Sequence, residues 1–352
     1  MSYRDNVRKV TPYVAGEQPK VTGRIIKLNT NENPYPPAPG VRRLMDEMKL
    51  SDLRLYPNTY AEPLRTVLAA RYGLKNENIF VGVGSDDVLA MAFLTFFAGE
   101  KPVLFPDITY SFYDVWAELF KIPYKQIPLT EDFKINADDY KIPNGGIVIA
   151  NPNAPTGVCE PLSFIEEILK SNPDSLVLVD EAYIDFGGES AVSLLPKYEN
   201  LLVVQTFSKS RSMAGLRIGY AMGSAEAIKA LDDVKNSYNS YTMNYPSQVL
   251  GTEAVKDEAY FKETCEKIIA TRERAKNELL KLGFTFPDSK TNFIFATHKS
   301  MKAEEIAAAL RANNIFVRHF KKPRIDNYLR ISIGTDEEMN SVFAVLKRVI
   351  HE

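Results

Sequence analysis

Four short apolar runs, each followed directly by polar residues, constrain the fold of this chain more than any other feature. The runs cover residues 79–83, 146–150, 176–179 and 201–204, and helical patterns alternate with them along the chain. Strands that are apolar along their whole length are typical of a parallel sheet covered by helices on both faces. The sequence therefore predicts an α/β fold. Ligands of such sheets bind at the carboxyl ends of the strands, so we expect a binding site where the polar residues meet.

The length of the chain, 352 residues, favours two domains over one compact core. We expect residues 1–40 to form an N-terminal arm and a segment of the small domain, and residues 41–256 to form the large domain. A long helical pattern begins at residue 257 and bridges to a small α+β domain, so that residues 257–352 could close over the site.

Charge, cysteine and histidine content argue against several classes of protein. The net charge of -2 implies no general attraction to nucleic acid or an anionic membrane. No apolar run approaches the roughly 20 residues of a membrane span, and the N-terminus lacks the apolar core of a signal peptide. Neither the two cysteines, Cys159 and Cys265, nor the dispersed histidines have a metal-type spacing. We expect a reduced, cytoplasmic protein without a metal site.

A lysine and an arginine follow the fourth apolar run, at Lys209 and Arg217, with Ser208 beside the lysine. A lysine on a loop behind a buried strand can be shielded from water, which makes its amine a better nucleophile. An arginine can hold a phosphate through paired hydrogen bonds. A nucleophilic lysine beside a phosphate clamp is what an enzyme dependent on pyridoxal 5'-phosphate (PLP) requires. Taken alone, both could be ordinary surface charges. Whether they belong to a cofactor site depends on the residues at the other strand ends.

The third run leads directly into Asp180, a carboxylate that should be partly buried and would then need a cationic partner. A protonated pyridine nitrogen would serve, and its protonation is what makes PLP an electron sink. A helix cap or a structural salt bridge is the alternative. Tyr183, three residues further on, could donate its hydroxyl to the phenolic oxygen of the cofactor, or it could be a packed aromatic.

A glycine turn and a helix start follow the first run. Ser85 is the expected N-cap of this helix, and free N–H groups at Ser85 and Asp86 could hold a phosphate. Tyr110, which follows another strand pattern, could stack on a cofactor ring or pack in the core. Arg318 and Arg330 lie on strands of the small domain, where they could bind a carboxylate or a phosphate, or face solvent.

Over nearly its whole length the chain resembles the fold-type-I PLP-dependent aminotransferases, and within them the histidinol-phosphate aminotransferases. The motifs that carry the resemblance are Thr11-Pro12-Tyr13, Leu28-Asn29-Thr30-Asn31-Glu32-Asn33-Pro34, Tyr56-Pro57, Gly84-Ser85-Asp86, Thr109-Tyr110, Pro152-Asn153-Ala154-Pro155-Thr156-Gly157, Asp180-Glu181-Ala182-Tyr183, the stretch from Ser208-Lys209 to Tyr220, and Leu329-Arg330-Ile331-Ser332. The resemblance implies the PLP-transferase fold of type I. This fold has a large domain with a mostly parallel sheet of the seven-stranded type between helices, and a smaller α+β C-terminal domain.

The resemblance also implies a role for each candidate residue. Lys209 is the catalytic lysine that bonds covalently to PLP, and Tyr56 reaches the cofactor phosphate in the other subunit of a homodimer. The remaining cofactor contacts are expected from Ser85, Asp86, Tyr110, Asn153, Asp180, Tyr183, Ser208 and Arg217. The expected substrate contacts are Arg330 for the α-carboxylate of glutamate, Arg318 for a substrate phosphate, and Tyr13, Asn31 and Asn33 near them.

One position departs from the family pattern. The family commonly has an asparagine directly before Pro-Thr-Gly, and that residue contacts the phenolic oxygen of the cofactor. This chain has Ala154 there and Asn153 one place earlier. We assign the contact to Asn153 as an expectation, while Tyr183 could hold that oxygen alone.

The resemblance implies a ping-pong transamination in histidine biosynthesis, in which L-histidinol phosphate and 2-oxoglutarate give imidazole-acetol phosphate and L-glutamate. Related enzymes act on aromatic amino acids or decarboxylate threonine phosphate, and both are alternatives, as is a non-enzymatic regulatory domain with the same fold. Arg318 favours a phosphorylated or dicarboxylate substrate over a plain aromatic one. One positive charge does not distinguish phosphate from carboxylate.

Overall fold

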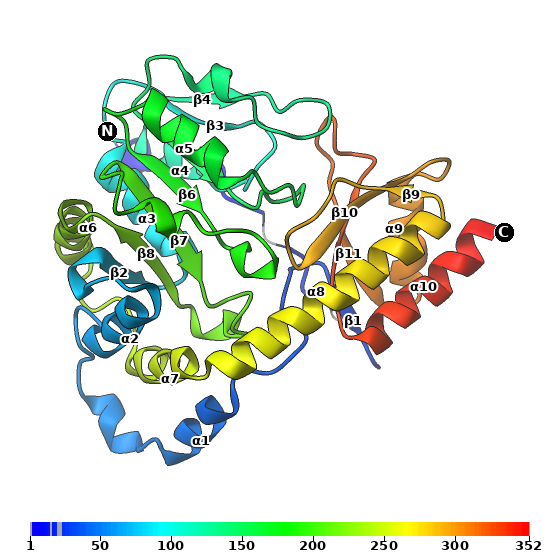
Figure 1. Cartoon of the computed structure of the whole chain (residues 1–352), viewed down its shortest axis with the longest axis horizontal. Helices are drawn as coiled ribbons and strands as arrows, with labels where there is room; N and C mark the ends of the chain where they lie inside the picture. Colours follow the sequence, from blue (N-terminus) through cyan, green and yellow to red (C-terminus); the bar gives the residue numbers. More distant parts are fainter. Residues whose placement is uncertain (1, 15, 20–22, 352) are drawn as a thin grey trace.

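The computed structural model describes residues 2–14, 16–19 and 23–351. In this part of the chain the strands form two sheets, one of seven strands and one of five (Figure 1). The long helix α8 (Glu258–Lys281) runs from the side of the large sheet to the side of the small one. The described residues thus form an α/β structure, as the sequence predicted.

The large sheet has the strand order β2-β8-β7-β6-β5-β3-β4. Its strands are β2 (Ile79–Gly82), β3 (Val103–Pro106), β4 (Tyr124–Ile127), β5 (Gly146–Ala150), β6 (Val177–Asp180), β7 (Leu201–Thr206) and β8 (Gly219–Gly223). Strands β3 to β7 run parallel to their neighbours within this group, whereas β8 is antiparallel to both β2 and β7. The prediction of a mostly parallel sheet is confirmed.

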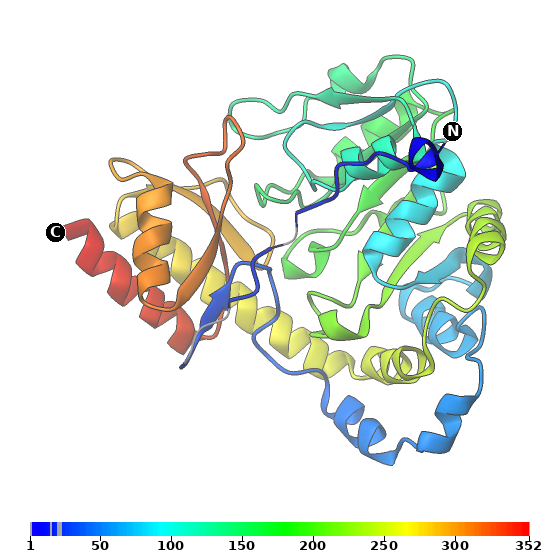
Figure 2. The same cartoon turned by 180° about the vertical axis from the view of Figure 1, so that it is seen from behind.

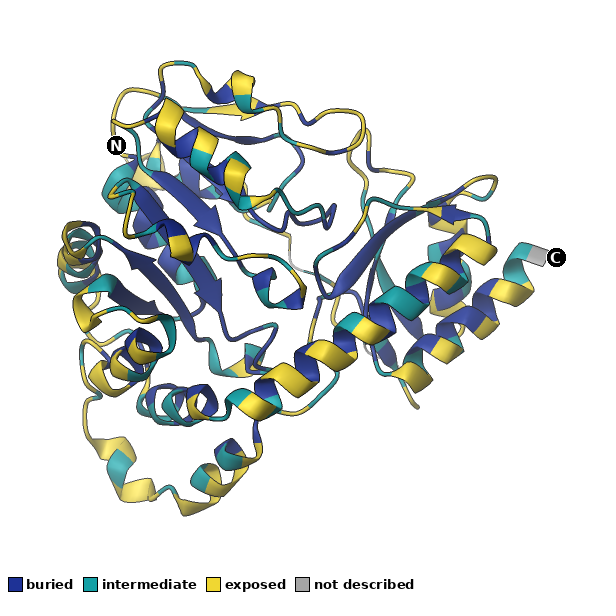
Figure 3. Ribbon diagram, viewed as in Figure 1, coloured by how far each residue is buried: buried dark blue, intermediate teal, exposed yellow. Residues whose placement is uncertain are grey.

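Alternate residues of the central strands pack into two different hydrophobic cores, one on each face of the large sheet. The helices that supply these cores are α2 (Glu62–Tyr72), α3 (Ser85–Phe96), α4 (Tyr113–Phe120), α5 (Leu162–Ser171), α6 (Ala225–Tyr238) and α7 (Tyr245–Lys256). On β6, Val177 and Val179 pack with α2, α5 and α7, whereas Leu178 packs with α3, α4 and α6. Burial on both faces explains why these strands are apolar throughout, and Figure 3 shows them as a continuously buried layer.

The small sheet joins residues from both ends of the sequence. In order, its strands are β1 (Ile26–Leu28), β11 (Ile315–His319), β12 (Leu329–Ser332), β10 (Phe293–His298) and β9 (Phe284–Thr285). Helices α8, α9 (Ala303–Ala312) and α10 (Asp336–His351) supply its hydrophobic core. Because β1 pairs with β11, the N-terminal segment crosses from the large sheet to the small one before the chain returns through α1 (Pro39–Glu47) (Figure 2).

Three local differences from the expected elements have physical causes. Strand β4 was not predicted, because this edge strand exposes Lys125 and Gln126 and lacks the continuous apolar pattern of the central strands. Helix α7 was also missed; it contains Gly251, where an added Cβ would lie 2.8 Å from the side chain of Ile218. The expected N-cap at Ser85 is wrong: the cap position belongs to Gly84, at a φ of 86°, and Ser85 is the first helical residue.

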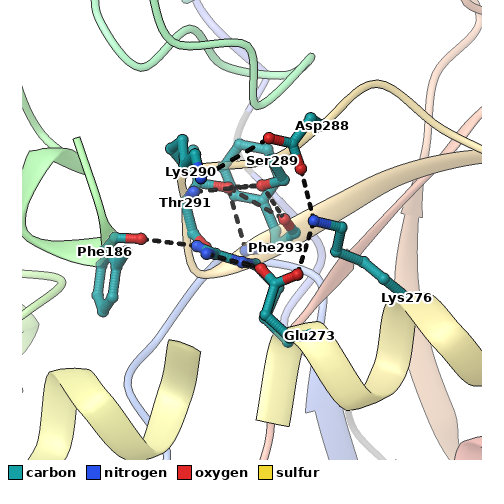
Figure 4. A network of polar contacts seen from close by, with 9 residues as sticks. Phe186, Glu273, Lys276, Asp288, Ser289, Lys290, Thr291 and Phe293 are labelled. Atoms are coloured by element: carbon teal, nitrogen blue, oxygen red, sulfur yellow. Dashed lines mark hydrogen bonds and ion pairs between the residues drawn. The ribbon is translucent and has the colours of Figure 1, made fainter. Parts of the chain in front are cut away.

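A buried arginine ties α8 to the loop that follows β6. Arg272 is 1% exposed, and its Nη1 donates to the carbonyl oxygens of Phe186 at 2.7 Å and Thr291 at 2.9 Å. Figure 4 shows both acceptor residues, with Glu273 and Lys276 beside them. Its Nη2 pairs with Glu273 at 2.9 Å. Phe186 belongs to a short helical turn (Ile184–Phe186) that follows β6, and Thr291 lies two residues before β10. A buried guanidinium needs all of these partners, so this side chain fixes how the two sheets sit together.

Within the described ranges, no helix is both long enough and apolar enough to cross a membrane. The same residues contain no group of three or more His, Cys, Asp or Glu side chains placed to hold a metal ion.

Candidate active site

A cavity of about 170 Å³ lies at the carboxyl ends of β5, β6 and β7, beside the start of α3. Its lining includes most of the residues expected to contact the cofactor, which are Ser85, Asp86, Tyr110, Asp180, Tyr183, Ser208, Lys209 and Arg217. Parallel strands end at the same edge of a sheet, so motifs far apart in the sequence meet there.

Lys209 lies just after β7, on the bend between this strand and β8. Its Nζ donates to the carbonyl oxygen of Thr30 at 3.2 Å and lies 5.7 Å from the centroid of the Tyr183 ring. The amide of Asn33 donates to the carbonyl oxygen of Lys209 at 3.0 Å, which fixes the backbone of the lysine. The amine thus faces the cavity with a neutral carbonyl as its hydrogen-bond partner, which leaves it available to a ligand.

Asp180 ends β6 and is 5% exposed at the wall of the cavity. Its Oδ2 accepts a hydrogen bond from the Tyr113 hydroxyl at 2.8 Å, and its Oδ1 accepts one from the backbone N–H of Ala182 at 3.2 Å. Burial raises the pKa of the Asp180 carboxyl to about 6, because the ionised form loses its hydration. A buried carboxylate with neutral hydrogen-bond partners, at the edge of a cavity, is suited to bind a cationic group of a ligand.

The start of α3 and Arg217 form an anion-binding corner of the same cavity. Arg217 Nη2 donates to Asp86 Oδ2 at 3.1 Å, and its Nη1 donates to Ser208 Oγ at 3.4 Å. A Cβ at Gly84 would lie 2.5 Å from Arg217 Nη2, and a Cβ at Gly219 would lie 2.2 Å from the backbone at the start of α3. These two glycines allow a guanidinium and a helix N-terminus to approach each other closely, and this combination binds phosphate.

Tyr110 separates this cavity from a second, more open hollow. Its hydroxyl donates to Asp86 Oδ1 at 2.7 Å, and its ring packs edge-on against Tyr113, with centroids 5.7 Å apart. Burial, with the Asp86 carboxylate beside it, raises the pKa of Tyr110 well above its usual value, so the hydroxyl stays neutral. Tyr110 is therefore both a packed aromatic and part of the cavity wall.

The second hollow has a volume of about 820 Å³ and brings Tyr13 and Arg318 next to Tyr110. The Tyr13 ring stacks on Phe112, with centroids 4.1 Å apart, so the N-terminal arm is docked on α4. Arg318 belongs to β11 and lies over the ring of Phe320, 5.8 Å from its centroid. Two of the expected substrate residues thus lie at the mouth of the cavity.

Arg330 on β12 pairs directly with Arg318 on β11 in the small sheet. Its Nη2 donates to the carbonyl oxygen of Asn29 at 3.1 Å, while its buried Nε has no hydrogen-bond partner among the described residues. Burial lowers the pKa of the Arg330 guanidinium, and the charge of Arg318 lowers it further. Two neighbouring cations repel each other until an anion joins them, so this part of the site favours an anionic ligand.

The structure does not place Asn153 at the cavity, contrary to the expectation. Its Nδ2 donates to the Ile108 carbonyl oxygen at 3.0 Å and to Thr156 Oγ1 at 2.9 Å, and its Oδ1 accepts from Thr109 Oγ1 at 2.8 Å. Ala154 lines the cavity instead. The polar atoms of Asn153 therefore hold the surrounding loops together.

Asn31 and Asn33 support the cavity from behind and do not line it. Asn31 is 1% exposed; its Nδ2 donates to the Tyr183 hydroxyl at 2.9 Å, and its Oδ1 accepts from Ser332 Oγ at 2.9 Å. Asn33 holds the backbone of Lys209, as described above. The residues of this loop that do line the cavity are Thr30 and Glu32.

Tyr56 lies apart from the cavity. It is 82% exposed beside a short helical turn (Leu50–Arg54), and its ring packs against Tyr241 with centroids 4.7 Å apart. Sequence reasoning also missed Tyr113, which holds Asp180. Its only signal in the sequence is its place in an aromatic-rich helix, and such residues usually pack in a core.

The comparisons with known proteins agree over nearly the whole chain. The family model of the class I and II aminotransferases matches residues 23–346. A histidinol-phosphate aminotransferase of Lactococcus lactis subsp. cremoris (strain SK11) is 54% identical over 350 residues, which cover 99% of this chain and 98% of that protein. A histidinol-phosphate aminotransferase of Clostridium botulinum (strain Kyoto / Type A2) is 52% identical over 351 residues, 99% of each chain.

Solved structures share the fold. The histidinol-phosphate aminotransferase from Clostridium acetobutylicum has a TM-score of 0.86 at 23% identity and covers 93% of this chain and 99% of that one. The enzyme of the same name from Sinorhizobium meliloti, in complex with pyridoxal-5'-phosphate, has a TM-score of 0.84 at 24% identity and covers 93% and 92%. The family model and the full-length relatives show that the chain belongs to the class I and II aminotransferases, in the group of the histidinol-phosphate aminotransferases.

Proposed function

We propose that this chain is a PLP-dependent histidinol-phosphate aminotransferase, which transfers the amino group of L-histidinol phosphate to 2-oxoglutarate in histidine biosynthesis. The observation that carries the proposal is a single cavity in which Lys209, the buried carboxylate of Asp180 and the anion-binding corner at Arg217 meet. The relatives that are more than half identical over the full length support the substrate. The alternatives, an aromatic-amino-acid aminotransferase, a threonine-phosphate decarboxylase or a regulatory domain, have no such support.

The chemistry of the cavity wall fits PLP. Asp180 would pair with the protonated pyridine nitrogen, since its carboxylate is buried and its recorded partners are neutral. Arg217 and Ser208, with the start of α3, would hold the phosphate, and the ring of Tyr110 would pack against the cofactor ring. Tyr183 would donate its hydroxyl to the phenolic oxygen.

When bound, PLP supplies an aldehyde that accepts the amino group and a ring that withdraws electrons from the substrate carbon. The chain supplies binding, orientation and proton transfer. Lys209 provides the amine that holds the cofactor and then moves a proton at the substrate carbon. Asp180 stabilises the positive charge of the ring nitrogen, which a neutral residue would not do.

The two neighbouring arginines account for the choice of anionic substrates. In this proposal Arg330 binds the α-carboxylate of glutamate through its guanidinium, and Arg318 binds the phosphate of histidinol phosphate in the outer hollow, beside Tyr13. We also propose that residues 1–40 and 257–352 form the part that closes over a large domain of residues 41–256. Since both Cys159 and Cys265 are free, we place the enzyme in the cytoplasm.

We further propose that the chain forms a homodimer, to which Tyr56 contributes a contact with the cofactor phosphate of the partner subunit. The support is an exposed apolar surface on the segment that projects from the large domain between α1 and α2 (Figure 1). There, Leu50 is 85% exposed and Tyr56 82% exposed, with Met45, Leu53 and Leu55 nearby in the sequence. Apolar surface of this kind marks an interaction site.

Replacing Lys209 tests the central claim. Purified wild-type protein should show the visible absorbance of lysine-bound PLP, and glutamate should shift it. Lys209→Ala should lose that absorbance and at least about 100-fold of the turnover, because proton transfer by a positioned group contributes at least that much. Lys290→Ala, at a lysine outside the cavity, is the matched control. Retention of both signals by Lys209→Ala would contradict the assignment.

The pKa of Asp180 gives a pH test on the cofactor-free protein. Burial raises this pKa from 3.8 to about 6 in the folded chain, so the stability due to the group is present below about pH 4 and is lost as the pH rises through about 6. This loss amounts to at most about 3 kcal/mol. Asp180→Asn should flatten that part of the curve of unfolding free energy against pH, measured in urea, and should weaken PLP binding. Glu181, with a pKa raised to about 7, adds the same slope to both proteins. Superimposable curves would contradict the role of Asp180.

Arg318→Ala separates the two substrates. If Arg318 binds the phosphate, kcat/KM for histidinol phosphate should fall about 10- to 100-fold, the range of one or two lost charge-assisted hydrogen bonds. The value for glutamate should change far less. Lys321→Ala, which removes a charge from the wall of the same hollow, is the control. Equal losses for both substrates would remove this role, and a wild-type preference for phenylalanine would support the aromatic alternative.

The oligomeric state can be measured directly by sedimentation. The wild-type chain should sediment as a dimer, and Leu50→Glu should shift it toward monomer because a charge at an apolar interface must be desolvated. Tyr56→Phe should leave the dimer intact and weaken PLP binding. A fully active wild-type monomer would rule out the shared site.

A further inference from the structure

Tyr183 is held by an asparagine from the loop that follows β1 of the small sheet. Its hydroxyl accepts a hydrogen bond from Asn31 Nδ2 at 2.9 Å. We propose that Asn31, locked by Ser332, is a positioning residue that sets the direction in which the Tyr183 hydroxyl donates its proton. This inference rests on the proposed PLP chemistry and deepens it, because the hydroxyl would then donate to the phenolic oxygen of the cofactor.

The hydrogen bonds that a phenol can make limit what the Tyr183 hydroxyl can do. A tyrosine hydroxyl has one proton to donate, and its oxygen can accept from others. Because Asn31 Nδ2 donates to this oxygen, the proton of Tyr183 remains free for another acceptor. Tyr183 lines the cavity, so that acceptor can be a ligand. If the Asn31 amide were turned around, its oxygen would instead take the proton of Tyr183.

Ser332 decides which way the amide of Asn31 faces. Its Oγ accepts from the backbone N–H of Asn31 at 3.0 Å, and its own proton goes to Asn31 Oδ1 at 2.9 Å. Ser332 is 1% exposed. A turned amide would donate to Ser332 Oγ and leave the buried serine proton without an acceptor, a cost that water could not relieve. The buried serine therefore keeps Asn31 Oδ1 on its own side and Nδ2 on the side of Tyr183.

The backbone of Asn31 is held in place as well. Asn31 has a φ of 58°, in the left-handed region, and Asn292 Nδ2 donates to its carbonyl oxygen at 3.0 Å. Asn292 is fully buried just before β10. Ser332 ends β12, and both of these strands belong to the small sheet. The small sheet thus controls a proton donor at the edge of the large sheet.

The orientation of the Tyr183 hydroxyl matters more in this chain because the cavity wall lacks the second hydrogen-bond donor that the family commonly has. Ala154 lines the cavity where the family commonly has an asparagine, and the amide of Asn153 is engaged with Ile108, Thr109 and Thr156. The Tyr183 hydroxyl therefore has no amide from this loop beside it. A single donor must point the right way, whereas two donors would tolerate a misdirected one.

The charged groups around Tyr183 come from three other elements. Lys209, after β7, lies 5.7 Å from the ring centroid. Arg330 on β12 lies 5.3 Å from the ring centroid of Phe293, against which the Tyr183 ring packs edge-on. Asp180, at the end of β6, lines the same cavity. None of these groups takes the place of the amide of Asn31 on the hydroxyl oxygen, so the direction of donation depends on Asn31.

The test uses the PLP-loaded enzyme and the pH midpoint at which its visible absorbance changes. A hydrogen bond donated to the phenolic oxygen stabilises the deprotonated form of the chromophore, so its loss should raise this midpoint. Asn31→Asp keeps the size of the side chain and tolerates a positive φ, but its carboxylate accepts the Tyr183 proton. The midpoint should rise by about one pH unit, the equivalent of one hydrogen bond to a charged group. Ser332→Ala should raise it less, because it only unlocks the amide.

Two comparisons show whether Asn31 acts through Tyr183. In a Tyr183→Phe background, the rise caused by Asn31→Asp should largely disappear, since both changes remove the same hydrogen bond. Asn292→Ala, which removes a hydrogen bond to the backbone of Asn31 and leaves its amide in contact with Ser332, should lower the melting temperature and raise the midpoint clearly less than Asn31→Asp does. An equal rise with and without the Tyr183 hydroxyl, an equal rise in Asn292→Ala, or no rise in Asn31→Asp would overturn the inference. Failure of the wild-type chain to take up PLP would instead overturn the proposed function.

Discussion

The site depends on a carboxylate that the fold buries with neutral hydrogen-bond partners. Asp180 ends the central strand β6, and neighbouring strands β5 and β7 and helix α4 shield it from water. Its pKa rises to about 6 because the ionised form has lost its hydration. A charge in this position is unfavourable until a cationic group joins it. The burial that destabilises the ligand-free chain therefore favours the binding of a cofactor with a protonated ring.

The residues of the candidate site come from both sheets. Lys209, Asp180 and the anion-binding corner at Arg217 line the cavity at the large sheet, whereas Arg318 of the small sheet lines the outer hollow and pairs with Arg330. The loop that follows β1 of the small sheet supplies Thr30 and Glu32 to the cavity wall, so the shape of the cavity depends on the relative position of the two sheets. Arg272 on α8 helps to hold this position. Ser332 of the small sheet donates to Asn31, and Asn31 in turn donates to the Tyr183 hydroxyl, so the small sheet is linked by hydrogen bonds to the cavity wall. Under the proposed function, small movements between the sheets would affect both substrate binding and proton donation.

Much of the large sheet could be predicted because burial on both faces leaves a direct trace in the sequence. Strands such as β5 and β7 are apolar throughout, and their ends carry the polar motifs. Edge strand β4 gave no such trace, since solvent on one side relaxes the choice of residues. The helix start at Ser85 was placed one residue late, because Gly84 occupies the cap at a positive φ that close approach to Arg217 requires.

The sequence by itself determined which residues meet at the cavity, because parallel strand ends lie at one edge whatever the detailed packing. This holds for Lys209, Asp180 and Arg217. Only the tertiary structure decided where the amides of Asn31 and Asn153 point, and that Tyr113 holds Asp180. The direction of a polar side chain is set by its hydrogen-bond partners, and these are remote in sequence: Asn31 and Ser332 are 301 positions apart. No local pattern records such a pairing.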